Sequence, residues 1–102
     1  MRLHEFCAPL LLYFATNHSL PPNVEALNIT AEEFVCPVSH KPYIYNPTGL
    51  PAPDPGARLI VYDPEPSHQG RRWAISVMEP HGDAPLIAKV IAIPESRFPR
   101  QH

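Results

Sequence analysis

The sequence predicts an α+β fold in which an N-terminal amphipathic helix packs on a small antiparallel meander sheet of three to four strands with proline-rich loops. Two patterns support this: apolar residues near the amino end recur at helical spacing, and short runs rich in β-branched and aromatic residues follow them. The 102 residues, 15 of them proline, suffice for one domain. We therefore expect a single domain over residues 1–102, with a helix at about 2–18, a connecting region at 19–41 and the sheet at 42–94.

The helix is predicted by one apolar stripe near the amino end. Spacings of 3, 1, 3, 1 and 3 place the following residues on one helical face: Leu3, Phe6, Cys7, Leu10, Leu11 and Phe14. Pro9 falls on the opposite side, where it either kinks the helix or marks a helix start near Ala8. Pro21 and the residues before it end the helix, because proline disfavours helix at the preceding residue. We expect the stripe to cover one face of the sheet.

Short turns are expected in the connecting region. Residues 23–27 are typical of one helical turn, and Thr30 with Glu33 forms a candidate capping box for a second turn. Pro37 disfavours helix at Cys36, so the chain should leave this region in an extended state.

The sheet is predicted by four runs with strand-like composition, at residues 43–46, 58–62, 73–78 and 87–93. In the third run, Trp73, Ile75 and Val77 alternate with other residues, so one face can be buried and the other partly open. The connections are too short for crossover helices, which favours antiparallel pairing of neighbours in a meander.

Charge and hydropathy exclude two classes of partner. Eight Lys and Arg against ten Asp and Glu give a net charge of −2, which disfavours binding to nucleic acid. Arg71 and Arg72 before Trp73 are typical of the start of a strand and not of a nucleic-acid contact. The apolar run at residues 10–15 is far shorter than the ~20 residues of a membrane helix. We expect no membrane segment in the chain as given, which would then be soluble. A true start upstream of Met1 would instead favour a periplasmic or envelope-exposed location.

Four residues are candidate metal ligands. Their side chains supply two pairs of potential zinc ligands: His4 with Cys7, and Cys36 with His40. The alternative is that Cys7 and Cys36 are buried free thiols beside exposed histidines, or that they form one disulfide. A small metal-binding module is thus one alternative function, while the main expectation is a chain without metal or cofactor.

The loop around residue 67 is a candidate catalytic site. Ser67 and His68 place a hydroxyl next to an imidazole, and Arg71 follows. The sequence has neither a Gly-x-Ser-x-Gly elbow nor a glycine-rich phosphate loop, and Ser67-His68-Gln69 is typical of a turn with a surface histidine. We therefore expect no catalytic residue, and keep a small enzyme with a loop site as a further alternative.

Five segments of the chain form a recognisable series: the helix end Leu-Leu-Leu-Tyr at 10–13, Leu-Pro-Pro-Asn-Val-Glu-Ala-Leu at 20–27, Glu-Phe-Val-Cys-Pro at 33–37, Lys-Pro-Tyr-Ile-Tyr at 41–45, and the strand, loop and strand passage at 59–73. Together these segments resemble bacterial type II secretion pseudopilins and related prepilin-like proteins of the planctomycete type. The resemblance covers about residues 10 to 95. It implies a helix followed by a small sheet, and a leader and membrane helix that would lie before Met1.

The resulting functional expectation is a non-enzymatic, pseudopilin-like structural or interaction domain related to type II secretion or type IV pilus-like assemblies. Such a domain would contact protein partners or copies of itself. The apolar stripe and the sheet edges are the expected contact surfaces wherever they are not buried.

Overall fold

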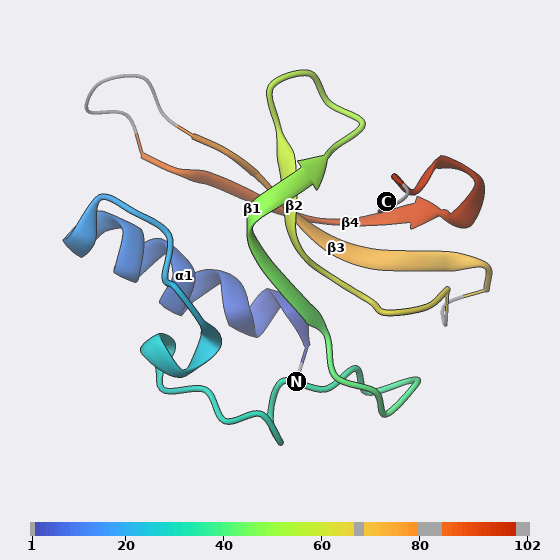
Figure 1. Cartoon of the computed structure of the whole chain (residues 1–102), viewed down its shortest axis with the longest axis horizontal. Helices are drawn as coiled ribbons and strands as arrows, with labels where there is room; N and C mark the ends of the chain where they lie inside the picture. Colours follow the sequence, from blue (N-terminus) through green and yellow to red (C-terminus); the bar gives the residue numbers. More distant parts are fainter. Residues whose placement is uncertain (1, 67–68, 80–84, 100–102) are drawn as a thin grey trace.

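The computed structural model describes residues 2–66, 69–79 and 85–99, and it confirms the predicted α+β architecture (Figure 1). One helix, α1 (Leu3–Asn17), packs on a four-stranded antiparallel sheet. The strands adjoin in chain order, which makes the sheet a meander, and their bounds are β1 (Ile44–Pro51), β2 (Arg58–Tyr62), β3 (Arg71–Met78) and β4 (Ile87–Pro94). Two short 3₁₀ turns, η1 (Val24–Leu27) and η2 (Glu95–Arg97), flank the sheet in sequence.

Helix α1 runs without interruption through Pro9, so the expectation of a helix start near Ala8 is wrong. Pro9 has no N–H to donate to the carbonyl of Glu5. The helix nevertheless begins at Leu3, because its apolar stripe packs on the sheet, and tertiary packing contributes most of the stability of a short helix. It ends at His18, which adopts a left-handed conformation and donates its N–H to the Phe14 carbonyl at 2.8 Å.

The predicted stripe of α1 is buried in part. Leu3, Phe6 and Leu10 are buried, and Cys7 and Phe14 are half-buried. Leu11 differs from the expectation, because 38% of its surface remains exposed. Successive residues of a helix are rotated by 100°, so Leu11 points well away from the direction of the buried Leu10. It therefore lies at the margin of the face that touches the sheet.

The capping box forms as predicted, but no second helix follows it. The Thr30 hydroxyl accepts from the Glu33 N–H, and the Glu33 carboxylate accepts from the Thr30 N–H, both at 3.2 Å. The chain then turns out of helical geometry, because Val35 pairs with Pro42 in an isolated antiparallel bridge. The predicted turn at η1 does form, and the Asn23 side chain accepts from the Ala26 N–H at 3.1 Å.

Strand β1 extends past the predicted residues 43–46, as far as Pro51. Pro47 and Pro51 are tolerated because β1 is an edge strand, where one side of the backbone has no partner strand. A register shift between Tyr45 and Leu50 accommodates Gly49, which has φ +84°.

Both faces of the sheet are covered in the middle. The second face of β3 is open only in part, since Ala74 and Ser76 are buried there while Met78 at the strand end is exposed. On the helix side, Ile75 and Val77 pack in a core with α1. On the other side, Ala74 belongs to a second cluster that includes Phe98 from the segment after η2. Strand β2 contributes to both clusters. Because the register shifts between Leu59 and Val61, the successive residues Ile60 and Val61 both belong to the helix-side core.

Candidate functional site

The four candidate metal ligands are spread over different environments. His4 is exposed on the first turn of α1, Cys7 is half-buried on the same helix, Cys36 is buried, and His40 is exposed in the connecting region. Both cysteines are free thiols, and burial raises the pKa of Cys7. Within the described ranges, no three His, Cys, Asp or Glu side chains gather closely enough to hold a metal ion.

The candidate catalytic pair, Ser67 and His68, lies outside the described residues. Arg71, the third residue of that hypothesis, is exposed at the start of β3. Its neighbour Arg72 has a structural role, since its guanidinium pairs with the Glu95 carboxylate at 2.7 and 2.8 Å and lies 4.4 Å from the centre of the Phe98 ring. These contacts tie η2 to β3.

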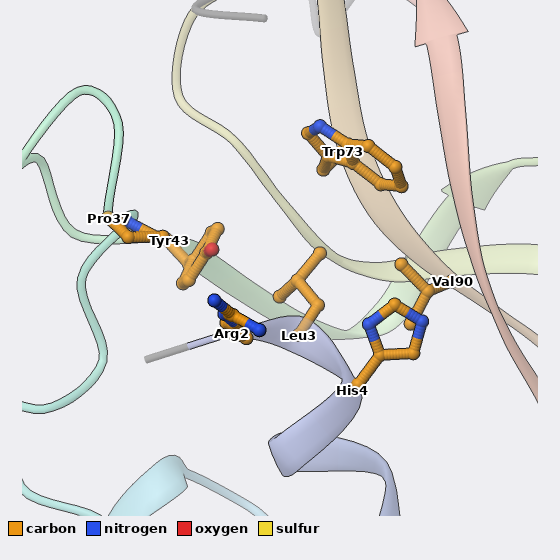
Figure 2. Close-up of a pocket in the computed structure, with 7 residues that line it drawn as sticks. All are labelled: Arg2, Leu3, His4, Pro37, Tyr43, Trp73 and Val90. Carbon is orange, nitrogen blue, oxygen red and sulfur yellow. The ribbon is translucent and has the colours of Figure 1, made fainter.

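A shallow hollow of about 330 Å³ opens beside the first turn of α1 (Figure 2). Apolar side chains from four parts of the chain line it together with two basic groups: Leu3, Pro37, Tyr43, Trp73 and Val90, with Arg2 and His4. His4 lies next to Val90 of β4, whereas Arg2 lies toward Tyr43 (Figure 2). The mainly apolar lining suits an apolar group. The hollow also orients the helix, because Leu3 and His4 of α1 share it with Val90 of β4.

Two residues that line this hollow, Tyr43 and Trp73, also belong to a small polar cluster with Asp63 and Cys36. Asp63 is fully buried, and its Oδ2 accepts from the Trp73 N–H at 2.9 Å. Burial raises the pKa of Tyr43 above its usual range, and the nearby Cys36 and Asp63, together with a hydrogen bond to the Cys36 side chain, raise it further. Asp63 precedes Pro64, a pairing typical of turns, so the local sequence does not reveal this burial. The bond from the Trp73 N–H to the Asp63 side chain, together with the bond from the Asp63 N–H to the Trp73 carbonyl at 3.0 Å, holds the end of β2 to β3.

The exposed side of α1 carries a second apolar stripe. Its four residues lie at i, i+3, i+4 and i+7, and each is exposed: Ala8, Leu11, Leu12 and Ala15, named here the outer stripe. Leu12 is 70% exposed, the highest value among the large apolar side chains described. From Ala8 to Asn17 the helix has no charged residue, so nothing on this side interrupts the stripe.

Three residues of the outer stripe, Ala8, Leu11 and Ala15, lie on the β4 side of the molecule. Helix α1 packs mainly against β3 and β4, and Figure 1 shows it alongside this hairpin. Phe6 turns toward β1, where its ring centre lies 6.1 Å from that of Tyr45. His4 points the other way and shares the hollow with Val90. Ala8, Leu11 and Ala15 continue from His4 at helical spacing, so they share its flank.

The leucine run at residues 10–12 was the signal for this second stripe. Three successive leucines span 200° of a helix, so they cannot all face one sheet. The sequence interpretation placed Leu10 and Leu11 in one buried stripe and assigned no role to Leu12. The structure separates them, with Leu10 buried and Leu12 exposed.

None of the helices within the described ranges has the length and apolar content needed to cross a bilayer. No protein-family model, curated protein or solved structure matches the chain.

Proposed function

We propose that this chain is a non-enzymatic, pseudopilin-like interaction domain that contacts neighbouring subunits through α1, in an assembly related to type II secretion or to type IV pilus-like structures. The observation that carries the proposal is the outer stripe, an uncharged apolar ridge on the exposed side of the only long helix described. A surface helix of a monomeric protein normally presents polar residues there. The helix-on-meander order is the arrangement implied by the pseudopilin resemblance.

The physical basis of the contact is burial of apolar surface. Moving a leucine side chain from water into an interface contributes roughly 1.5–3 kcal/mol, and Leu12 is largely exposed in the free domain. Alanines at positions 8 and 15 flank the two leucines and allow another helix to approach closely, while Leu11 and Leu12 supply the area. The fitting partner is therefore a second apolar helical ridge, as in another subunit of the same kind.

Sedimentation of the purified chain over a range of concentrations tests this proposal. We expect self-association, and we expect Leu12→Gln to weaken it about tenfold or more, as for a central apolar contact. Val38→Gln is the matched control, because Val38 is 55% exposed in the connecting region and is not part of α1. A wild-type chain that stays monomeric, or a Leu12→Gln variant that associates like Val38→Gln, would overturn the proposal.

A further inference from the structure

The two edges of the sheet differ in their capacity to accept another strand. Strand β1 forms one edge, and Pro47, Gly49, Pro51 and a register shift interrupt it. Strand β4 forms the other edge and pairs with β3 in unbroken register over all eight of its residues. Regular edge strands readily pair with further strands, whereas prolines and bulges block such pairing. The β4 edge is therefore the open one.

The phase of the ladder shows which backbone groups of β4 face outward. Beyond the last strand pair, the Glu95 N–H donates to the Gly70 carbonyl at 3.0 Å, and the Asp63 N–H donates to the Trp73 carbonyl at 3.0 Å. Odd-numbered residues of β3 therefore bond to β2, and even-numbered ones bond to β4. Within β4, the residues whose N–H and C=O groups bond to β3 are Ile87, Lys89, Ile91 and Ile93.

The intervening residues, Ala88, Val90 and Ala92, direct their N–H and C=O groups away from the sheet. Pro94 has the same phase, which explains why a proline is tolerated there, since its missing N–H would face outward. Within the described residues, no backbone bond from outside the sheet reaches these three positions. They form a row of donors and acceptors along a regular strand.

We propose that β4 pairs antiparallel with β4 of a second copy of this chain, about a two-fold axis at Val90, to form a continuous eight-stranded sheet. This register gives every outward N–H of Ala88, Val90 and Ala92 a carbonyl partner. A register about Ala92 would place Val90 opposite Pro94, which has no N–H to donate. Pairing about Val90 also sets Lys89 opposite Ile91 of the second copy, so the one charge on the strand does not face its own copy directly.

The outer stripe identifies the occupant of the edge as a second copy. Resting on the proposed function, this assignment follows because three residues of the stripe, Ala8, Leu11 and Ala15, lie on the same side of the molecule as the open edge. A two-fold interface brings the same patch of each subunit together, so the outer stripes of the two α1 helices approach across the axis that pairs the strands. Ala88 and Ala92 on the helix side of β4 have small side chains, which leave room for this approach. In the dimer both outer edges of the sheet are β1 strands. Since β1 cannot pair with a further strand, no third copy can add to the sheet.

Amide hydrogen exchange, followed by NMR at low and high protein concentration, tests the pairing. At low concentration the Lys89 and Ile91 amides should be protected while those of Ala88, Val90 and Ala92 exchange fast. At high concentration the latter three should slow about tenfold or more, in step with dimer formation. Association that leaves these three amides fast would overturn strand pairing but leave helix contact standing. Protection of them in a dimer insensitive to both Leu11→Gln and Leu12→Gln would instead remove the helix contact.

A charge exchange at Val90 tests the register. On the proposed axis Val90 faces its own copy, so Val90→Lys and Val90→Glu should each weaken the homodimer about tenfold or more, while their equimolar mixture should form a heterodimer. Circular dichroism checks that each variant is folded. Folded variants whose mixture associates no better than either alone would overturn the register, and the exchange experiment on the wild-type chain needs neither variant.

Discussion

At the residue scale, two tyrosines show how burial fixes a protonation state. The Tyr45 hydroxyl donates to the Pro21 carbonyl at 2.5 Å, and burial raises the pKa of Tyr45 from 10.0 to about 12. Tyr43 is shifted in the same direction. Through hydrogen bonds to Pro21 and Cys36, the two side chains join the connecting region to the sheet.

This shift makes stability depend on alkaline pH. The unfolded chain loses the Tyr45 proton near pH 10 and the folded chain near pH 12, so the free energy of unfolding should fall as pH rises between these values and be fully retained below pH 10. Urea unfolding at a series of alkaline pH values measures this fall. In Tyr45→Phe the slope should be shallower, with the remainder due to Tyr43, and a lost hydrogen bond should lower stability by about 1 kcal/mol at every pH. Equal slopes in the two proteins would contradict the assignment to Tyr45.

At the level of single elements, α1 has two apolar sides: one packs on the sheet, and the other is proposed to contact another subunit. Leu10 is fully buried against the sheet, whereas Leu12 is exposed two residues later. The same chemical substitution at these two positions therefore separates the packing of the helix from its proposed contact with another subunit.

Leu10→Ala should lower the free energy of unfolding by about 2–5 kcal/mol, because it removes buried methyl groups and leaves a cavity. Leu12→Ala, the matched control, should change it by less than about 0.5 kcal/mol, since it alters exposed surface and alanine is a good helix former. Urea unfolding at a concentration where the chain is monomeric gives both values. A similar cost for the two variants would show that α1 does not pack on the sheet through the Leu10 side.

At the scale of the whole molecule, the two central strands hold the fold together because both clusters meet on them. Val61 and Ile75 are fully buried and face each other across β2 and β3, in the same phase as the Asp63–Trp73 bond. The connecting region buries Val24, Ile29 and Phe34 in the core, but its backbone forms only short turns, and Glu25 and Glu32 are exposed. Opening should therefore start there and reach the central strands last.

Native-state hydrogen exchange of the monomer should follow this order. We expect the Val61 and Ile75 amides to exchange only on global unfolding, and the amides of Glu25 and Glu32 to exchange through local opening at much lower free energy. Denaturant should accelerate the first pair steeply and the second pair hardly at all. Uniform exchange across these four amides would indicate that the turns and the sheet open as one unit.

Much of the fold followed from local patterns. Helical spacing predicted α1, β-branched runs predicted β2, β3 and β4, and the capping box at Thr30 and Glu33 formed as expected. The extension of β1 was missed, because its prolines are compatible with a strand only when that strand lies at an edge. Whether a strand lies at an edge depends on the whole sheet and cannot be read from the residues of that strand alone.

The class of each element and the order of the elements follow from local patterns, because side-chain periodicity and turn chemistry act within a few residues. Tertiary packing sets which surfaces remain available: that Leu11 and Leu12 stay exposed, that Asp63 is buried, and that β4 is the open edge. The reason is physical, since periodicity specifies a face of a helix or strand, whereas only packing against distant residues specifies what that face meets.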